Sequence, residues 1–325
     1  MNDPAGFATR GLRLALVGDF ALDAYWFLDP AKSAPSLETG LPTRPIRIQR
    51  YSLGGAANVA ANMAALGCRT VHALGVVGRD PWAVEMIRQL EGRGVDASGL
   101  LVQEDGWNTP VFIKPHLKGR ESNRFDTADY NRLSRRTENA LFGRLERLLP
   151  RVDILVVNQQ IRDSLHCASF RRRMAWLLKR HRDRLIIADT RDYGREYRHA
   201  ALKLNEHEAR RLSGARDTRK AAITLYRRSR RPVFVTRGRR GCLVCWKGGL
   251  AGVPALKVRG RTDTVGAGDS TLAGLALALA AGRNPVEAAR FGNLVATVTV
   301  RKLYTTGIAT MTEVRRLARG RGGGS

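Results

Sequence analysis

The residues best placed to do chemistry lie at positions 263–270, which read Asp-Thr-Val-Gly-Ala-Gly-Asp-Ser. An Ala- and Leu-rich run follows, so we expect a helix that begins at the glycines. The first turn of a helix presents unpaired N–H groups and the positive end of its dipole, and small residues let an anion approach them. Asp269 at this position can orient a hydroxyl toward a phosphoryl group held on those N–H groups. This geometry is the one that a kinase needs, although an Asp at a helix start is more often only a cap.

Two upstream motifs fit the same chemistry. Gly18-Asp19, with Asp23, follows an apolar run at 14–17, and carboxylates at a strand end can accept hydrogen bonds from sugar hydroxyls. Residues 54–58, Gly-Gly-Ala-Ala-Asn, let the backbone approach a ligand and then begin a helix whose Asn58 can bond further hydroxyls. Turn-forming aspartates and a packing glycine pair are the plain alternatives. Neither a Gly-Lys-Ser/Thr loop nor a clean Gly-x-Gly-x-x-Gly occurs, so P-loop and Rossmann dinucleotide sites lose their main support.

Length and composition indicate one large α/β unit. The chain has 325 residues, of which 43% are hydrophobic and 26% charged, which is ordinary for a globular protein. Its longest apolar run, at 275–281, is far shorter than the ~20 residues that cross a bilayer. The first residues carry an early acid and no apolar signal core. We therefore expect no membrane segment and a cytoplasmic location.

The net charge is unusual for a chain of this length. Lys and Arg number 56 against 29 Asp and Glu, which gives a net charge of +27. A protein this basic binds polyanions non-specifically at low salt. The basic residues are spread along the chain, without the aromatic or zinc-binding motifs of nucleic-acid modules. Solvated basic faces are the favoured interpretation, and a non-catalytic nucleic-acid-binding protein remains the alternative from another class.

The four cysteines are too few for a disulfide scaffold of this length. Cys242 and Cys245 have the spacing of a redox or zinc pair, but they lie in the apolar run 242–246. That run is typical of a buried strand, so we expect core thiols.

Strands and helices alternate along the chain. Apolar runs at 14–17, 70–77, 154–157, 185–188 and 233–236 suit parallel strands covered on both faces, and helices are expected at 58–66, 82–92 and 170–180. The segments 47–52 and 109–115 are less apolar and suit peripheral strands. The pattern predicts a doubly wound, mostly parallel α/β sheet with a small extra sheet, and ligands bind at the carboxyl ends of such strands. We expect one domain over 1–318, strands of the extra sheet within about 20–52 and 108–126, and a flexible Gly-rich tail at 319–325.

In its motifs the chain resembles the PfkB/ribokinase family of sugar kinases. Residues 54–58 with Gly67, and residues 263–269, resemble the two signatures of that family in the right order. Residues 205–208, Asn-Glu-His-Glu, match its Asn-x-x-Glu motif, and residues 236–241 match its Thr-x-Gly-x-x-Gly motif. The resemblance covers nearly the whole chain.

The resemblance implies a role for each matching residue. Asp269 is implied as the catalytic base, with Gly266, Ala267 and Gly268 forming the anion hole for the transferring phosphoryl group. The implied sugar ligands are Asp19, Asp23, Gly54, Gly55 and Asn58. The implied nucleotide site comprises Asn205, Glu208, Thr236, Gly238, Gly241, Thr264 and Asn293. Glu208 is also implied to act near the metal, through water.

The resemblance further implies the cofactors and the assembly. ATP and Mg²⁺ are expected, together with a monovalent cation as a further candidate. A small β-sheet lid is implied, which in this family is often a dimer contact, so a homodimer through the lid is expected.

The substrate is less constrained by the sequence. Residues 18–26 and 123–126 look most like the heptose-phosphate kinases of the family, which phosphorylate carbon 1 of a heptose 7-phosphate. A sugar that already carries phosphate needs a basic clamp, for which Lys114, Arg124 and Arg191 are candidates, each of them otherwise a surface charge. Residues 158–162 and 189–191 depart from the Asp-Tyr-x-Lys-Gly and Asp-Pro-Lys motifs of those kinases, and position 204 lacks the common Pro. Ribose, a fructose derivative or a nucleoside therefore stay open as alternative substrates.

Overall fold

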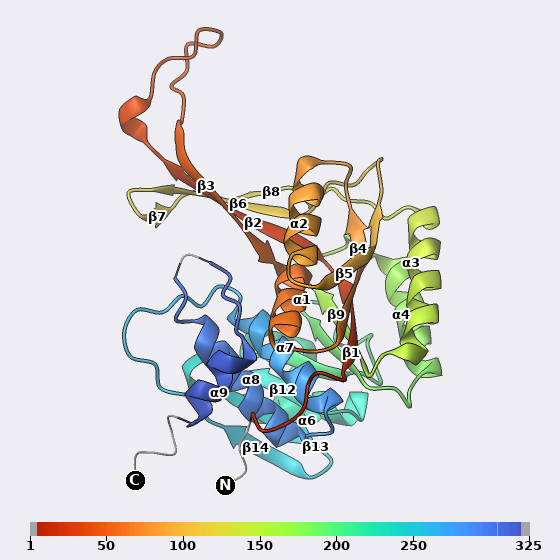
Figure 1. Ribbon diagram of the computed structural model, residues 1–325. Coiled ribbons are helices and arrows are strands. Elements are labelled where there is room, and N and C mark those ends of the chain that lie inside the picture. The colour runs from red at the N-terminus through yellow and green to blue at the C-terminus, as the bar shows by residue number, and fades with distance from the viewer. Residues whose placement is uncertain (1–4, 304, 320–325) are drawn as a thin grey trace.

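The computed structural model describes residues 5–303 and 305–319, and their strands form two sheets (Figure 1). The larger sheet has nine strands in the order β14-β13-β12-β11-β10-β9-β1-β4-β5. Its strands are β1 (Arg13–Gly18), β4 (Thr70–Val77), β5 (Val95–Val102), β9 (Ile154–Gln159), β10 (Ile186–Thr190), β11 (Ala201–Asn205), β12 (Val233–Thr236), β13 (Cys242–Trp246) and β14 (Gly249–Val253). From β5 to β12 all neighbours run parallel, and β13 and β14 add an antiparallel hairpin.

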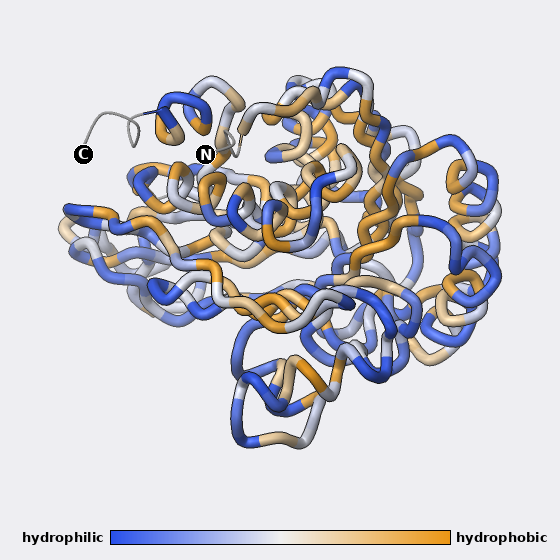
Figure 2. The backbone as a smooth tube through the Cα atoms, turned by 90° about the horizontal axis from the view of Figure 1, so that it is seen from below, coloured by the Kyte–Doolittle hydropathy of each residue, from blue (hydrophilic) through white to orange (hydrophobic). Residues whose placement is uncertain are grey.

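Helices cover both faces of the large sheet, as its apolar strands require. The core on one face joins the sheet to α1 (Gly55–Ala65), α2 (Pro81–Glu91), α7 (Ala267–Ala280), α8 (Pro285–Thr299) and α9 (Met311–Arg319). The other core joins it to α3 (Arg135–Leu148), α4 (Ala168–Arg180), α5 (Glu206–Ser213) and α6 (Thr218–Ser229). Within β1 the side chains alternate, Leu14 and Leu16 toward the first core, Ala15 and Val17 toward the second. Figure 2 shows hydrophobic segments running through the middle of the molecule beneath more hydrophilic helices and loops.

Local signals in the sequence explain where several helices begin and end. Asp80 caps α2 by accepting from the Ala83 N–H, and Pro81 takes the first helical position. The helix α8 begins with a capping box between Asn284 and Glu287. After α1, Gly67 adopts a positive φ of 84°, the conformation that ends a helix, as its place after the Ala-rich run predicted.

The smaller sheet lies over the carboxyl end of β1 and forms a lid. It consists of β2 (Phe20–Leu28), β3 (Ile46–Gly54), β6 (Val111–Leu117), β7 (Arg120–Glu121) and β8 (Phe125–Asp126), in the order β3-β2-β6-β7 with β8 beside β6. In Figure 1 the connection between β2 and β3 extends away from the body as a long arm. It contains the short helix η1 (Pro30–Lys32), and further single turns, η2 (Leu149–Arg151) and η3 (Gly238–Arg240), lie in the body.

The α/β class predicted from the sequence is confirmed, with the parallel core and the extra sheet in place. The strands expected at 70–77, 233–236 and 242–246 have the same bounds in the structure. The helix expected at 58–66 begins earlier, at Gly55, and the peripheral strand expected at 47–52 is longer, at Ile46–Gly54. The tail expected at 319–325 lies outside the described residues beyond Arg319. Among the described helices, none has both the length and the apolar character needed to cross a bilayer.

The topology fixes where a ligand can bind. The strand β1 pairs with β4 on one side and with β9 on the other, so the chain winds away from it in both directions. Ligands of open α/β sheets bind at such a switch point, outside the carboxyl ends of the strands. Gly18 and Asp19 lie at that end of β1.

Candidate active site

The start of α7 supplies main-chain donors next to a carboxylate. Gly266 is the N-cap and has a φ of 74°, a conformation that glycine adopts without strain. A Cβ there would also lie 2.6 Å from Nδ2 of Asn58. The Ala267 N–H closes the turn onto the Thr264 carbonyl at 3.2 Å. The N–H groups of Gly268 and Asp269 have no main-chain acceptor among the described residues, so they are available for an anion.

Asp269 lies in the first turn of α7 with its carboxylate held by one neutral donor. Nδ2 of Asn58 donates to its Oδ2 at 3.1 Å. Burial raises the pKa of Asp269 to about 7, and the Asn58 hydrogen bond and the Lys203 ammonium oppose that rise. A general base works best when its pKa lies near the working pH. Asp269 is therefore poised to accept a proton.

Both signature segments open onto one cavity of about 1010 Å³. Its walls come from the lid, from the carboxyl ends of the parallel strands, from the start of α7 and from α8. The predicted site residues that line it are Asp23, Gly55, Lys114, Arg124, Arg191, Asn205, Glu208, Thr236, Gly238, Gly241, Thr264, Gly266, Ala267, Gly268, Asp269 and Asn293. Residues more than 200 positions apart in the sequence thus meet in one place, as the two motifs required.

Three residues predicted to hold the sugar do not line this cavity. Asp19 is 3% exposed, and its Oδ2 accepts the N–H groups of Gln160 and Ile161 at 2.7 and 2.9 Å. Gly54 packs against Asp23, since a Cβ there would lie 3.1 Å from Oδ2 of Asp23. Asn58 is fully buried behind Asp269. The structure thus gives Asp19 a bond to the loop after β9, and Asn58 a bond to Asp269.

The lid end of the cavity carries charge that is already paired. Nζ of Lys114 lies 2.7 Å from Oδ1 of Asp23, and both side chains are less than a tenth exposed. Burial raises the pKa of Asp23, while Lys114 opposes the rise. Arg124 donates to both oxygens of Asp126, at 2.7 and 2.6 Å. The two cations predicted as a phosphate clamp therefore each hold a carboxylate in this structure.

Arg191 is the third candidate for that clamp and differs from the other two. It follows β10, is exposed, and lines the cavity between the lid and Glu208. No ion pair to its guanidinium is found in the described part of the chain. It is near enough to lower the pKa of both Asp19 and Glu208. Its charge is free to meet a phosphate.

The residues predicted to bind a nucleotide line one part of the cavity, which we call the nucleotide end, and this part is built on the start of α5. Asn205 and Glu208 form a capping box, in which each side chain accepts the main-chain N–H of the other, at 2.8 and 2.7 Å. Burial, followed by the nearby Asp189, raises the pKa of Glu208. Asn293 in α8 donates to the carbonyls of Val253 and Pro254 at 3.2 and 3.1 Å. It thereby ties α8 to the segment after β14, which forms the wall of the cavity.

Sequence reasoning missed a buried ion pair in this region. Nζ of Lys203 lies 2.7 Å from Oδ2 of Asp189, at the carboxyl ends of neighbouring strands, and both side chains are less than a tenth exposed. Lys203 also acts on Asp269, and a Cβ on Gly268 would lie 3.1 Å from its Nζ. The sequence did contain an indication of this buried ion pair, because Lys203 stands between two leucines in an apolar strand. A charge in that setting is rarely buried unless it is paired.

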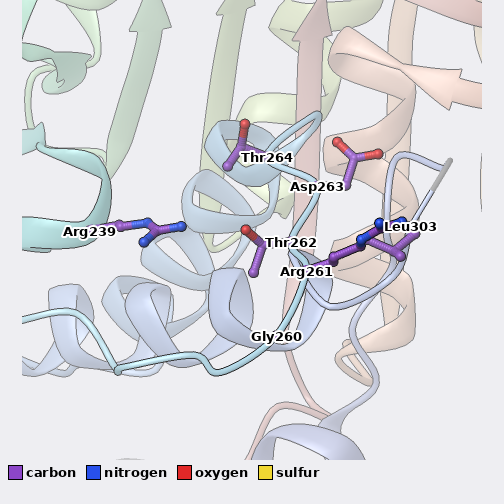
Figure 3. A pocket seen from close by; sticks show the side chains of 7 residues that line it. All are labelled: Arg239, Gly260, Arg261, Thr262, Asp263, Thr264 and Leu303. Carbon is purple, nitrogen blue, oxygen red and sulfur yellow. The ribbon is translucent and has the colours of Figure 1, made fainter. Parts of the chain in front are cut away.

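A smaller cavity of about 530 Å³ continues from the nucleotide end (Figure 3). Figure 3 shows Arg239 reaching toward Thr262 and Thr264 on the loop before α7, with Arg261 and Leu303 on the opposite side. Arg239, Thr262 and Thr264 also line the large cavity, so the two spaces share one wall. Asp263 lies on the same loop, and its Oδ1 accepts the Val265 N–H at 3.0 Å.

The fold and this site together define a kinase of the ribokinase-like class. The structure is similar to a ribokinase from Thermotoga maritima, with a TM-score of 0.76 and 23% identity over 95% of this chain and 99% of that one. It is also similar to a ribokinase from Arabidopsis thaliana solved with ribose and ATP, with a TM-score of 0.74 and 20% identity over 95% and 99% of the two chains.

Residues 19–311 match the profile of the pfkB family of carbohydrate kinases, and the chain belongs to this family. It is therefore a phosphotransferase with an alcohol group as acceptor, and the predicted family is confirmed. A relative named "Bifunctional protein HldE" from Pseudomonas aeruginosa is 30% identical over 93% of this chain and 62% of that protein. The protein of the same name from Caulobacter sp. is 29% identical over 96% and 64%. The chain thus spans less than two thirds of the length of these relatives.

Proposed function

We propose that this carbohydrate kinase transfers the γ-phosphoryl group of ATP to a hydroxyl of a sugar phosphate, with heptose 7-phosphate, phosphorylated at carbon 1, as the first candidate. The observation that carries the reaction is the position of Asp269. It lies in the first turn of α7, beside two free N–H groups, at the point where the lid end and the nucleotide end of one cavity meet. A hydroxyl bound at one end and a phosphate bound at the other would meet beside Asp269.

The reaction follows from this placement. The acceptor hydroxyl donates a hydrogen bond to Asp269, which aligns its oxygen with the γ-phosphorus. The new P–O bond forms, the bond between that phosphorus and the bridging oxygen of ADP breaks, and the hydroxyl proton passes to Asp269. Charge that develops on the transferring group is stabilised by the N–H groups of Gly268 and Asp269. Catalysis of this kind rests on positioning and charge stabilisation.

The chain offers a suitable place for Mg²⁺. The described residues contain no cluster of three acidic, His or Cys side chains, but Mg²⁺ usually takes only one or two carboxylates and completes its shell with water and substrate phosphates. Glu208 has one oxygen in its capping box, which leaves the other for a water ligand of the ion, and Asp189 lies close enough to raise its pKa. When bound, the ion neutralises charge on the phosphates of the nucleotide.

The choice of a heptose phosphate rests on two observations. The relatives named HldE are the first support, at 30% identity or slightly less. The second is Arg191, the unpaired guanidinium on the cavity wall. A phosphate on the sugar that reaches this side of the cavity would gain a bidentate partner.

A kinase for an unphosphorylated sugar or another alcohol is the second candidate. It is favoured by the Lys114–Asp23 and Arg124–Asp126 pairs, because cations that already hold carboxylates recruit a phosphate less strongly. The Asp23 carboxylate would then accept hydroxyl hydrogen bonds, which is the role predicted from the sequence.

A substrate panel separates the two candidates. The purified protein is incubated with ATP and Mg²⁺ and, in turn, heptose 7-phosphate, ribose, fructose, fructose 6-phosphate and a nucleoside. ADP release and the phosphorus NMR spectrum of each product are then measured. Fast turnover of heptose 7-phosphate, with a new signal from a phosphate on carbon 1, supports the first candidate. Fast turnover of a neutral sugar alone would exclude it.

Arg191→Gln tests the clamp directly, with Arg162→Gln as the matched control, since Arg162 follows the neighbouring strand β9 and pairs with Asp192. For heptose 7-phosphate we expect Arg191→Gln to raise KM at least about tenfold, since one charge-assisted pair is lost. Arg162→Gln should leave KM within about threefold. Equal effects of the two variants would remove Arg191 from the site.

A further inference from the structure

At the edge of the large sheet opposite the active site lies a row of arginines that form no ion pair within the described part of the chain. Seven neighbouring strands, β5-β4-β1-β9-β10-β11-β12, run parallel, so their starts lie along one edge and their carboxyl ends along the other. We define a strand-start segment as the first residue of each of these strands and the three residues before it. These segments are 92–95, 67–70, 10–13, 151–154, 183–186, 198–201 and 230–233, in the order of the strands across the sheet.

Every strand-start segment contains at least one arginine. Toward one side of the sheet these are Arg93, Arg69, Arg10 and Arg13. The only acids in the seven segments are Asp153 and Asp183. Asp153 is already used, because its Oδ2 accepts the main-chain N–H of Arg13 at 2.7 Å.

The other side of the edge continues the pattern with Arg151, Arg184, Arg198, Arg230 and Arg231. Neighbouring strands lie about 4.8 Å apart, so the row is about 29 Å long from β5 to β12. Phosphates of one nucleic-acid strand follow each other at about 3.4 Å along a duplex axis. The row is thus long enough to meet several successive phosphates.

Some arginines at the carboxyl edge of the sheet form ion pairs, whereas those in the strand-start segments form none in the described chain. At the carboxyl edge, arginines pair with acids across neighbouring loops: Arg79 with Glu104, Arg162 with Asp192, and Arg240 with Glu206. At the opposite edge, none of the arginines in the strand-start segments makes an ion pair within the part of the chain that the structure describes. The strand-start arginines are therefore distinguished by their alignment along one edge, since many arginines elsewhere, Arg191 among them, also make no ion pair in the described part of the chain.

Part of this pattern has a structural cause. Crossover helices end at this edge, and arginines stabilise the carbonyls exposed at helix ends. Arg93 donates to the Gln89 carbonyl at 2.7 Å, Arg184 to that of Pro150 at 2.9 Å, and Arg231 to that of Arg182. No such side-chain bond is found within the described chain for Arg10, Arg69, Arg151 or Arg198, all of which are exposed. Their guanidinium groups have no structural use in the chain itself.

We propose that this edge binds the phosphate backbone of a nucleic-acid duplex, without regard to sequence. Arginine favours phosphate because its planar fork bonds two oxygens at once. None of the large apolar side chains that are exposed in the described chain lies in a strand-start segment, which favours a phosphate backbone over a membrane surface. Because the cavity opens at the other edge, a bound duplex leaves the active site accessible to a small substrate.

The experiment compares two quadruple variants with the same change in net charge. In the edge variant, Arg10, Arg69, Arg151 and Arg198 are changed to Gln. In the control variant the same change is made at Arg44, Arg136, Arg216 and Arg315, which are exposed and lie outside the strand-start segments. None of the eight residues lines either cavity. The unfolding temperature of each protein establishes that it is folded.

Binding is measured by fluorescence anisotropy on labelled DNA and RNA duplexes of about 24 base pairs, at salt concentrations from about 50 to 200 mM. We expect the edge variant to lose at least about tenfold in affinity at 100 mM salt, and its salt slope to fall by about 3 to 4, since each lost phosphate contact removes about 0.9. The control variant should lose less than about threefold. Both duplexes should bind alike, because phosphates carry the contact.

Three results would overturn the proposal. Equal losses in the two variants would show that the whole surface charge acts, not this edge. No binding of the unmodified protein at the lowest salt would show that the edge has no affinity for duplexes. Tighter binding to vesicles that contain phosphatidylserine than to either duplex would assign the edge to a membrane surface.

Discussion

Asp269 shares its surroundings with two other carboxylates, those of Asp23 and Asp189, and with the ammonium group of Lys203. A carboxylate at a helix start would ordinarily ionise easily. Here burial outweighs the helix dipole, and the pKa rises to about 7. The residue that we propose as the catalytic base therefore also carries a cost in stability when it is ionised.

The first consequence concerns turnover. Asp269→Asn keeps the oxygen that accepts from Asn58 but cannot take a proton, so we expect kcat to fall by about 10²- to 10⁴-fold. The dissociation constant for ATP should change less than about threefold, because the carboxylate aligns the hydroxyl and does not hold the nucleotide. Single-turnover kinetics and equilibrium titration measure the two quantities. Near-normal turnover would remove Asp269 from its role.

The pH profile follows from the same pKa. The base must be ionised to work, so kcat/KM should rise with pH through a pKa near 7 and then level off. A rate profile measured from about pH 5 to pH 9 shows this limb directly. A flat profile across neutral pH would contradict the placement of Asp269 as the base.

A stability measurement needs no substrate. The pKa of Asp269 in the folded state, about 7, lies above its ordinary value of 3.8, so its contribution to stability is present below about pH 4 and is lost as the pH rises through about 7. Asparagine does not titrate. We therefore expect Asp269→Asn to raise the unfolding temperature at about pH 8 and to change it much less at about pH 4. An unchanged unfolding temperature at pH 8 would show that burial of this carboxylate carries no cost.

At the scale of elements, the active site depends on where two helices begin. The helix α1 starts directly after the lid strand β3, and α7 starts at Gly266, whose positive φ turns the chain into the helix. Asn58 from α1 reaches Asp269 in α7, and Asn62 supports Asn58 by donating to its Oδ1 at 3.1 Å. The two helix starts are thus fixed to one another by buried amides.

Gly266→Ala tests this arrangement. Its Cβ would lie 2.6 Å from Nδ2 of Asn58 and its positive φ would be strained, so we expect a loss of stability of about 1 kcal/mol or more together with a large loss of kcat. Gly282→Ala is the matched control. Gly282 follows the other end of α7 with a φ of 76°, and nothing lies within 4 Å of its Cβ position.

The control variant should therefore lose a similar amount of stability through strain but keep its kcat. Urea unfolding and steady-state kinetics on both variants separate the two effects. Equal kinetic losses would mean that strain at either end of the helix, and not the contact with Asn58, controls activity.

Much of this element-level structure could be predicted from the sequence. The apolar runs at 70–77 and 233–236 stand between turn residues, so local pattern sufficed to place β4 and β12. The Ala-rich run that follows Gly266 and Gly268 was sufficient to predict the helix α7. The start of α1 was placed too late, because glycine is a poor helix former and contacts distant in sequence, such as the bond from the Ala56 N–H to the Asp19 carbonyl, hold that first turn.

Side-chain partners could be predicted less well than elements. The motifs brought most of the site to one cavity, but the position of Asp19 at a strand end did not reveal that the loop after β9 would take its carboxylate. The pairing of Lys203 with Asp189 likewise joins two strands whose adjacency only the folded sheet defines. Side-chain contacts between residues that are distant in sequence are difficult to predict from a single sequence.

At the scale of the whole molecule, the lid arm extends far from the body (Figure 1), and apolar side chains are exposed along it. Leu37 and Leu41 are fully or largely exposed, and Ile46 and Ile48 on β3 are 37% and 43% exposed. The outer edge of β3 has no neighbouring strand among the described residues. An open edge with apolar side chains invites pairing with another chain.

We therefore expect a homodimer through the lid, with Ile48→Glu shifting it toward monomer. A buried unpaired carboxylate is costly, so the dimer dissociation constant should rise at least about 100-fold. Val84→Glu on α2, where the side chain is 69% exposed, is the matched control and should leave the dimer intact. Analytical ultracentrifugation measures both. A monomer for the unmodified protein at all concentrations would exclude this assembly.

The burial of the thiols decides which cysteine a labelling reagent can reach. Burial raises the pKa of Cys68 and of Cys242 to about 12 and also raises that of Cys245, so at neutral pH these groups hold almost no reactive thiolate. Cys167, half-buried beside the Ser169 hydroxyl, is then the main site that a maleimide would label. Replacing Cys167 alone should give a nearly silent background on which two introduced dyes, one on the arm and one on α2, report any change in the distance between these elements when a substrate binds.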